Sequence, residues 1–489
     1  MRSSLRRGWP AVLALPVALL AATPASAATV NGGTFVVHYF DVSNEANDVT
    51  VSQTATDFVF TDIVPLAVTG SCVSVNATTA TCPLGVVEDI SVDLGGMNDR
   101  MTGSASLTPL GAARDEDLLV DGGDGNDVIT GGPDVKNSLS GGEFSAGSNT
   151  LTGGSLTDTL IGGEGPDQLS AGAGPDRLSG GLGNDSLSAG PGDDEFFDLT
   201  FSGAPDGADA ISGGTGFDRF HYDGRIASVG ASLGPAPDGA GCPGSGCEGD
   251  AIGGDVEALE GGEANDVLTG DGGDNSLRGM GGDDVVDGAG GADQVNGNPG
   301  DDVVRGGAGD DFEVSGDEGE DLLSGGAGDD VLLSGRILDD ADDLRGGKGT
   351  DLADYRSAGS AVRIDLDGRA DDGVAGENDN VRPDVEDVLG TPFNDVLTGS
   401  KRSNELVGGD GNDRIAGKAG LDGLSGGRGR DRLAGGKGID LLEGEAGPDR
   451  ITSRDNGADQ VFCGSSIDRV KANRGDRIAA DCDKVALRR

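Results

Sequence analysis

The sequence predicts an all-β protein organised as a solenoid, and three observations support this. A nine-residue phrase, Gly-Gly-x-Gly-x-Asp-x-apolar-x, recurs from Gly122 almost to the C-terminus. Glycine contributes 92 of the 489 residues. Each repeat carries one regularly placed apolar residue, at its eighth position. Because so short a unit can bury that residue only against its neighbours, a strict nine-residue period predicts stacked turns.

The repeat is clearest in six copies: GGDGNDVIT at Gly122, GGEGPDQLS at Gly162, GGLGNDSLS at Gly180, GGTGFDRFH at Gly213, GGAGDDVLL at Gly325 and GGDGNDRIA at Gly408. Glycines at positions one, two and four allow the positive φ angles of a tight turn and leave backbone carbonyls uncovered. The apolar eighth position is typical of the inward side chain of a very short strand.

The sixth position is nearly always aspartate, a hard oxygen donor that suits Ca²⁺, whereas thiolate and imidazole ligands are lacking. With the uncovered carbonyls, these aspartates are the predicted calcium ligands. They are Asp127, Asp167, Asp176, Asp185, Asp194, Asp218, Asp266, Asp284, Asp293, Asp302, Asp311, Asp321, Asp330, Asp351, Asp395, Asp413, Asp422, Asp431, Asp440 and Asp449.

The energetics predict that folding requires the ion. Burying one Leu or Val stabilises a repeat by roughly 1.5 to 3 kcal/mol, whereas ordering each of nine backbones costs about 1 to 2 kcal/mol. The formal net charge of −51 adds repulsion between stacked carboxylates. Bound Ca²⁺ would offset both terms, so the chain without calcium is expected to be largely disordered. So acidic a chain also argues against nucleic acid or an anionic membrane as a partner.

The pattern resembles the nonapeptide calcium-binding repeats of hemolysin-type (RTX) proteins, and the whole chain resembles the secreted repeat proteins of this type in actinobacteria. The resemblance implies a parallel β-roll with alternate repeats on opposite sides and ions held between consecutive loops. Asp266, Asp284 and Asp302 would then form one row, and Asp293 and Asp311 the other. Three positions depart from the pattern: Asn275 and Asn404 replace the aspartate, and Glu313 falls in an inward apolar position.

The N-terminus indicates export. Three arginines, an apolar run at residues 11–22 and Ala25-Ser26-Ala27 form a secretory signal peptide, with cleavage expected after Ala27 and an uncleaved anchor as the alternative. No other run is long enough to span a bilayer. The cysteines form three local pairs, Cys72 with Cys82, Cys242 with Cys247 and Cys463 with Cys482. Disulfides are expected, with a zinc site as the alternative.

The predicted organisation is a signal peptide (1–27), a β-rich N-terminal region (28–110), repeat arrays at 111–220, 261–354 and 390–452, excursions at 221–260 and 355–389, and a disulfide-stapled cap (453–489). Two interpretations of the N-terminal region stay open, a small antiparallel domain or the first turns of the solenoid. GGMNDRMTG at Gly95 favours the second, although Asp99 comes one place early.

The two excursions are duplicates. Each contains a tyrosine (Tyr222, Tyr355), an alternating strand and a polar loop, and then reaches the tripeptide DVE before the repeats resume. They are interpreted as a ligand surface, as cover for the solenoid edge, or as a further cation site.

The leading functional prediction is a secreted, non-catalytic calcium-binding protein. There is no HExxH motif, no Gly-x-Ser-x-Gly elbow is evident, and only two histidines, His38 and His221, are present. The alternatives are an adhesin or matrix protein that binds polysaccharide or a cell surface through the excursions, and a hydrolase or epimerase.

Overall fold

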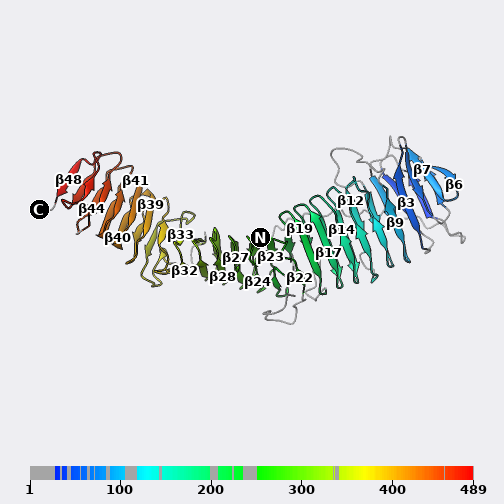
Figure 1. Cartoon of the computed structure of the whole chain (residues 1–489), viewed down its shortest axis with the longest axis horizontal. Helices are drawn as coiled ribbons and strands as arrows, with labels where there is room; N and C mark the ends of the chain where they lie inside the picture. The colour runs from blue at the N-terminus through cyan, green and yellow to red at the C-terminus, as the bar shows by residue number, and fades with distance from the viewer. Residues whose placement is uncertain are drawn as a thin grey trace.

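The computed structural model describes residues 28–487 except 33–35, 41–45, 55–56, 63–65, 71, 84–88, 105–117, 143–145, 199–206, 223–224, 235–249, 334, 336–340 and 456. The predicted signal peptide and the Cys242–Cys247 pair lie outside these residues. The described chain is an elongated rod of short strands that runs from the N-terminal end to the C-terminal end (Figure 1). It contains no helix, and therefore none of the length and hydrophobicity needed to cross a membrane.

The strands of the described residues form one long sheet and three shorter sheets. The long sheet contains β1 (Ala28–Gly32), β2 (Val36–Phe40), β5 (Leu66–Gly70), β8 (Asp89–Asp93), β10 (Leu118–Asp121), β12 (Asn137–Ser140), β14 (Thr159–Glu164), β16 (Arg177–Leu182), β18 (Glu195–Phe197), β20 (Arg219–His221), β23 (Ala258–Glu260), β25 (Ser276–Arg278), β27 (Gln294–Pro299), β29 (Glu313–Glu318), β31 (Val331–Leu333), β33 (Leu352–Asp354), β37 (Asp387–Leu389), β39 (Glu405–Gly411), β41 (Gly423–Gly429), β43 (Leu441–Glu443), β45 (Gln460–Phe462) and β47 (Arg477–Ile478).

Three partner sheets follow one another along the opposite side. The N-terminal partner sheet contains β3 (Asp48–Gln53), β4 (Asp57–Thr61), β6 (Val73–Asn76), β7 (Thr79–Pro83), β9 (Arg100–Gly103), β11 (Val128–Thr130), β13 (Thr150–Thr152), β15 (Gln168–Ser170), β17 (Ser186–Pro191), β19 (Ala210–Thr215) and β22 (Ala251–Ile252). The middle partner sheet contains β21 (Gly230–Ser232), β24 (Val267–Thr269), β26 (Val285–Asp287), β28 (Val303–Ala308), β30 (Leu322–Ala327), β32 (Asp343–Lys348) and β36 (Asn380–Val381). The C-terminal partner sheet contains β34 (Val362–Asp365), β35 (Gly373–Val374), β38 (Val396–Thr398), β40 (Arg414–Gly420), β42 (Arg432–Gly438), β44 (Arg450–Ser453), β46 (Arg469–Ala472) and β48 (Lys484–Leu487).

Parallel pairing in the arrays confirms the predicted β-roll. Successive strands alternate between the long sheet and a partner sheet, so residues eighteen apart pair, as Leu277 does with Val295. The core is a single column of apolar side chains on each side. Leu268, Val286 and Val304 stack on one side and are fully buried. One inward residue per strand is therefore the whole hydrophobic contribution of a repeat, as its sequence predicted.

The prediction that Glu313 points inward is wrong. The segment after Asp311 contains one extra residue, so the aspartate spacing along this row rises to nineteen. Phe312 is displaced outward and is 57% exposed, while Val314 takes the inward position and is fully buried. Glu313 lies on the outer face, where Gln294 Nε2 donates a hydrogen bond of 2.6 Å to its Oε2. The apolar column selects the register, and the insertion is absorbed in the turn.

The N-terminal region combines both predicted arrangements. Its strands β8 and β9 pair in parallel with β10 and β11 of the first array, so it continues the stack. Strands β3, β4, β7 and β6 pair antiparallel and extend the end of the rod. Asp99 joins the repeat pattern after all, because Met97 adopts φ 91° and supplies the left-handed turn that a glycine normally provides.

Each excursion exchanges the order of two strands. Strand β21 precedes β22 in the sequence, yet β21 begins the middle partner sheet while β22 ends the N-terminal one. In the second excursion, β35 and β34 likewise begin the C-terminal partner sheet although both precede β36, which ends the middle one. The long sheet continues through both levels. The two excursions therefore form two equivalent seams, at which only the partner side is interrupted.

Candidate metal centres

All twenty predicted aspartates occupy one structural position, in the turn directly before a strand. Each is buried, with at most 3% of its surface exposed. In each, Oδ1 accepts a hydrogen bond from the backbone N–H of the corresponding residue one turn earlier on the same side. Asp266 N–H donates to Asp284 Oδ1 and Asp284 N–H to Asp302 Oδ1, both at 2.7 Å. The side chains thus form ladders that tie consecutive turns together.

The ladders run along both sides of the rod. On the side of the long sheet the position is held in turn by Asn137, Asp158, Asp176, Asp194, Asp218, Glu257, Asn275, Asp293, Asp311, Asp330, Asp351, Glu386, Asn404, Asp422, Asp440, Asp459 and Asp476. On the opposite side it is held by Asn47, Asp99, Asp127, Asn149, Asp167, Asp185, Asp209 and Asp250, then by Asp266, Asp284, Asp302, Asp321, Asp342 and Asp379, and then by Asp395, Asp413, Asp431, Asp449, Asp468 and Asp483. The two rows predicted from the register are confirmed.

The second carboxylate oxygen, Oδ2, is the chemically unusual atom. In seventeen of the twenty it is buried and has no hydrogen-bond partner within the described chain: Asp127, Asp167, Asp176, Asp185, Asp194, Asp218, Asp284, Asp293, Asp302, Asp311, Asp330, Asp351, Asp413, Asp422, Asp431, Asp440 and Asp449. Buried polar atoms are nearly always hydrogen-bonded. A regular row of buried carboxylate oxygens without a hydrogen-bond donor therefore points to a ligand that is not part of the protein chain.

Many of the orphaned oxygens face a backbone carbonyl across a glycine, whereas Ala171 and Ala189 hold the glycine position before Asp176 and Asp194. A Cβ atom added to Gly288 would clash with both Asp293 Oδ2 and the carbonyl oxygen of Gly306. Gly279 has the same relation to Asp284 and Gly297. The missing side chain thus leaves a space lined by oxygens from two consecutive turns. An all-oxygen donor set without nitrogen or sulfur fits Ca²⁺ among the common biological metals.

The raised pKa values of the ladder carboxylates also favour a bound cation. Burial raises the pKa of Asp302 to about 7, and the carboxylates of Asp284, Asp283 and Asp301 add to the rise, although the N–H of Asp284 opposes it. Burial likewise raises the pKa of Asp284 to about 7. At neutral pH these carboxylates are held charged only at a cost, which a divalent cation between the turns would remove.

Asn149 shows what replaces the carboxylate where no ligand is needed. Its oxygen accepts from Asp127 N–H at 2.9 Å, as a ladder aspartate would. Its Nδ2 occupies the Oδ2 place and donates to the carbonyl oxygen of Gly162 at 3.2 Å. The amide therefore satisfies, within the protein, the carbonyl that elsewhere faces an orphaned oxygen.

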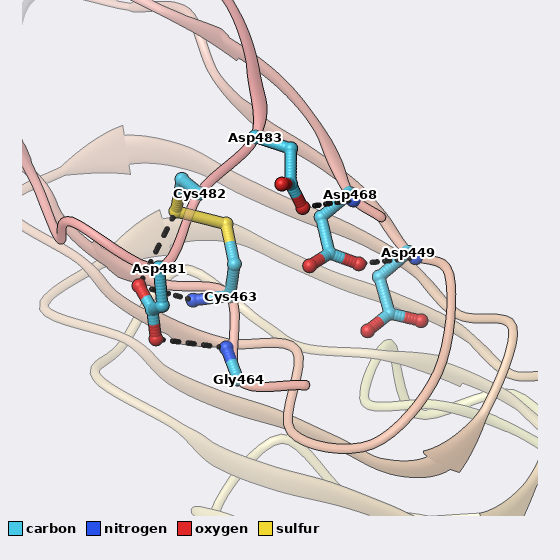
Figure 2. Close-up of a disulfide and its surroundings, with 7 residues drawn as sticks. All are labelled: Asp449, Cys463, Gly464, Asp468, Asp481, Cys482 and Asp483. Carbon is cyan, nitrogen blue, oxygen red and sulfur yellow. Dashed lines mark hydrogen bonds between the residues drawn. A yellow bond between two sulfur atoms is a disulfide. The ribbon is translucent and has the colours of Figure 1, made fainter. Parts of the chain in front are cut away.

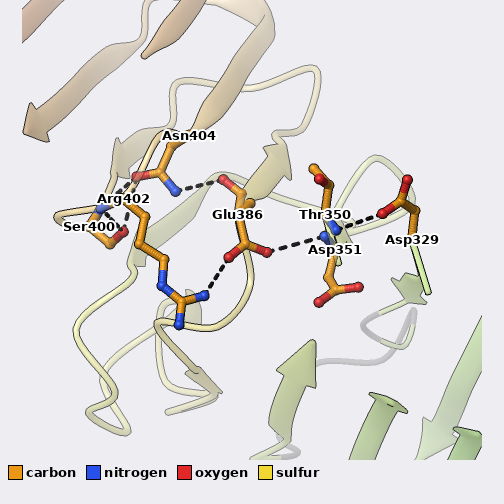
Figure 3. Close-up of polar contacts among 7 residues, drawn as sticks. All are labelled: Asp329, Thr350, Asp351, Glu386, Ser400, Arg402 and Asn404. Carbon is orange, nitrogen blue, oxygen red and sulfur yellow. Dashed lines mark hydrogen bonds and ion pairs between the residues drawn. The ribbon is translucent and has the colours of Figure 1, made fainter. Parts of the chain in front are cut away.

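A second hydrogen-bond ladder lies outside the first. Its direction is opposite, because here the accepting side chain belongs to the earlier turn and the donating N–H to the later one. The side chains of exposed Asp or Asn residues at position five accept from the turn that follows, as when Asp329 Oδ1 accepts from Thr350 N–H at 2.8 Å (Figure 3). Sequence reasoning missed this role. The signal was present in the frequent Asp-Asp and Asn-Asp pairs, which place one side chain in each ladder.

The glutamate of each DVE tripeptide substitutes for a ladder aspartate at a seam. Asp351 N–H donates to Glu386 Oε2 at 3.3 Å, and Arg402 Nη1 lies 2.6 Å from Glu386 Oε1 (Figure 3). Asn404 Nδ2 donates to the backbone oxygen of Glu386 at 2.7 Å. At this level the guanidinium of Arg402 and the amide of Asn404 supply hydrogen-bond donors to Glu386.

On the partner side, each seam buries its tyrosine against an aspartate. Tyr222 donates to Asp250 Oδ2 at 3.1 Å, and Tyr355 donates to Asp379 Oδ2 at 3.0 Å. Both tyrosines are 1% exposed. Tyr39 makes the same hydrogen bond to Asp62 at the N-terminal end. Sequence reasoning found the tyrosines but not these partners, because each lies at least 23 residues away across a polar loop.

Ladder residues at irregular spacing were also missed, namely Asp99, Asp158, Asp209, Asp250, Asp342, Asp379, Asp459 and Asp468. Each precedes a strand, but most of the turns between them are longer than nine residues. The alternation Asp-x-apolar, without the glycines, was the signal that could have found them.

Two of the predicted disulfides are present, Cys72–Cys82 and Cys463–Cys482. The second fastens the last turns of the rod, and Gly464 N–H donates to Asp481 Oδ2 beside it at 3.0 Å (Figure 2). Asp449 and Asp468 continue the ladder to Asp483 in the same region (Figure 2). Sulfur consumed in disulfides offers no thiolate for zinc in either pair.

The contacts of His221 indicate a structural role. It is 8% exposed in β20, and its Nδ1 lies 2.9 Å from Glu260 Oε2. Arg278 also contacts Glu260, at 3.1 Å. The hydrogen bond from His221 lowers the pKa of Glu260. This cluster joins neighbouring strands of the long sheet and resembles a cross-strand ion pair more than an acid and base aimed at a substrate.

Comparison with known proteins agrees with this geometry. The family model for the RTX calcium-binding nonapeptide repeat matches residues 119–134, 145–178, 161–196, 260–295, 287–312, 313–336, 389–424 and 425–461. These segments fall mainly within the three arrays, of which residues 197–220 and 337–354 are among the unmatched parts, and they include only the boundary residues 260 and 389 of the seams. No curated protein matches the chain.

Proposed function

We propose that this hemolysin-type RTX repeat protein is a secreted, non-catalytic calcium-binding β-roll whose folding is coupled to Ca²⁺. The twenty aspartates predicted from the sequence would hold the ions, together with carbonyl oxygens of the facing turns. Arrays at 111–220, 261–354 and 390–452, separated by the seams, are part of this proposal. The signal peptide predicted from the sequence at residues 1–27 supports secretion.

The row of orphaned Oδ2 atoms carries the proposal. Leaving a charged group buried and unpaired is costly in a protein, and the same arrangement recurs at nearly every turn. Ca²⁺ would supply positive charge shared between consecutive turns. The aspartates hold their Oδ1 atoms in ladder hydrogen bonds, which orients Oδ2, and the glycines leave room for the ion. Binding free energy would then become folding free energy.

The described residues of the seams give no support to the adhesin alternative. Carbohydrate sites commonly expose aromatic rings, but Tyr222 and Tyr355 are buried against Asp250 and Asp379. These side chains close the ends of the partner sheets.

Far-ultraviolet circular dichroism of the mature protein tests the proposal. In chelator the β signal should be largely lost, and it should return at roughly 0.1 to 1 mM Ca²⁺. Mg²⁺ should substitute poorly, because it requires compact octahedral geometry. A β spectrum and protease resistance that persist after complete removal of divalent ions would refute coupled folding.

A further inference from the structure

The C-terminal partner sheet carries a straight column of basic side chains on its outer face. Arg414 pairs in register with Arg432, Arg432 with Arg450, Arg450 with Arg469, and Arg469 with Lys484. All five side chains are exposed. With neighbouring strands about 4.8 Å apart, the column is about 19 Å long. It lies at the C-terminal end of the rod, along β40, β44 and β48 in Figure 1.

The charge of this end differs from that of the rest of the chain. Residues 391–489 contain 17 of the 35 Lys and Arg residues but only 16 of the 86 Asp and Glu residues. Eight of those acids, including Asp413 and Asp431, are buried in the ladders. The exposed charge of this end is therefore predominantly positive, on a protein with a net charge of −51.

Several outward basic residues elsewhere in the rod pair with a carboxylate on the neighbouring strand. Arg177 contacts Glu195 at 3.0 Å, and Arg278 contacts Glu260 at 3.1 Å. The five residues of the column make no ion pair within the described chain, and each faces another cation. Like charges directly opposite one another in a sheet are destabilising. The column is thus an uncompensated cost, which an external anion would remove.

The surroundings of the column define the shape of its ligand. Two positions further along the strands stand the small residues Ala416, Ala434, Thr452 and Ala486, with one further cation, Lys471, between the last two. These give a flat shelf beside the cations. Four of the five cations are arginine, whose planar guanidinium forms paired hydrogen bonds to carboxylate and sulfate groups. An extended single chain with regularly spaced anionic groups fits a straight row of this kind.

We propose that this face, which we call the basic column (Arg414, Arg432, Arg450, Arg469 and Lys484), binds an extended anionic polysaccharide bearing carboxylate or sulfate groups. Single-stranded nucleic acid is disfavoured because its binding sites use aromatic stacking platforms, and the strands β38, β40, β42, β44, β46 and β48 present no aromatic side chain. An anionic membrane is disfavoured because interfacial binding also needs large apolar side chains, whereas the row beside the column consists of alanine, threonine and Lys471.

The test uses the full-length mature protein in saturating Ca²⁺, with immobilised dextran sulfate and hyaluronan as sulfate and carboxylate probes and neutral dextran as the blank. The variant replaces Arg414, Arg432, Arg450 and Arg469 with Gln. The matched control replaces Lys401, Arg428, Arg430 and Lys437 with Gln, which removes the same charge from the same end of the rod outside the column. Calcium-induced folding of both variants is followed by circular dichroism, so that failure of this inference is separable from failure of the proposed function.

The column variant should bind at least one charged polysaccharide about tenfold more weakly than the control does. Its slope of log affinity against log salt should fall by about 3, from the four lost contacts. Equal losses in the two variants would overturn the proposal, as would no binding above neutral dextran. Stronger binding to oligo-dT or to anionic vesicles than to either polysaccharide would assign the column to another partner and overturn it too. Self-association at low salt that the column variant abolishes would point to a second copy instead.

Discussion

Replacing Asp284 and Asp302 together with asparagine should have opposite effects in the absence and presence of calcium. Asparagine keeps the Oδ1 acceptor for the N–H groups of Asp266 and Asp284, both now 2.7 Å away. It replaces the orphaned Oδ2 with a neutral donor, as Asn149 does naturally. The variant should therefore favour the folded state in chelator and weaken calcium binding.

The magnitude follows from the burial of the two carboxylates. Burial raises the pKa of each from 3.8 to about 7, which corresponds to roughly 4 kcal/mol per group at neutral pH. Solvent screening in the turns reduces this to about 2 kcal/mol per group. The new amide hydrogen bonds add about 1 kcal/mol each. The double variant should therefore stabilise the calcium-free fold by several kcal/mol and lose about tenfold in calcium affinity at the adjoining sites.

The assay measures the two effects separately. In chelator, folding is induced with trimethylamine N-oxide, which favours burial, and the midpoint is read by far-ultraviolet circular dichroism. Calcium affinity is measured by calorimetry. The control replaces Asp283 and Asp301 with asparagine, which removes the same charge one residue away. These exposed side chains keep their acceptor role toward Asp301 and Glu320 N–H, so little change is expected.

A higher osmolyte midpoint for the Asp284 and Asp302 variant than for the wild type would refute the reasoning, because the orphaned oxygens would then not be costly. An unchanged calcium affinity would show that these carboxylates are not ligands.

Three further predictions concern pH, the seams and the cap. Burial raises the pKa of Asp293 to about 6 and that of Asp302 to about 7 in the folded chain, above the ordinary 3.8, and it raises the pKa of other ladder aspartates such as Asp194 and Asp431 in the same direction. Protonation therefore favours folding. In chelator the protein should gain β signal as the pH falls from 8 to 5, and a spectrum that does not change would contradict this. Tyr355→Phe removes the hydrogen-bond donor of Asp379 Oδ2 and should lower the free energy of unfolding by about 1 to 3 kcal/mol. Tyr222→Phe should have the same effect, and both are measured by urea unfolding of the calcium form. If neither variant lost stability, these hydrogen bonds would not stabilise the seams. Replacing Cys463 and Cys482 with serine should lower the free energy of unfolding by roughly 3 kcal/mol and speed up hydrogen exchange in β47 and β48 alone. Faster exchange throughout the rod would instead show that the cap controls the stability of the whole stack.

The sequence predicted the parts of this structure that repeat. The apolar eighth position fixed the core, as Leu268 and Val286 illustrate, and the sixth position located all twenty aspartates in one kind of turn. The error at Glu313 arose from counting positions across an insertion. Packing selects Val314 because leaving the core column empty costs more than bulging one residue into the solvent.

The seams could not be predicted because their contacts are not periodic. Strand β21 lies beyond β22 although it precedes it in the sequence, and a local pattern contains no information about such an exchange. The partner of Tyr355 is likewise set by the path of the loop, which brings back Asp379 from 24 residues away. What the sequence did reveal was that the two excursions are equivalent, since both repeat the same order of tyrosine, strand and DVE.

The seams differ from the arrays in how their buried oxygens are satisfied. Asp379 accepts through both carboxylate oxygens, from Asp342 N–H and Tyr355. The first aspartate after the second seam, Asp395, has Oδ2 bonded to Thr391 N–H at 2.7 Å rather than orphaned, and Asp266 Oδ2 accepts from Gly262 N–H after the first seam. Under the proposed function, protein donors would replace the cation at these levels on the partner side. The seams would then divide the rod into separate calcium-dependent arrays, while the uninterrupted long sheet keeps those arrays in one register.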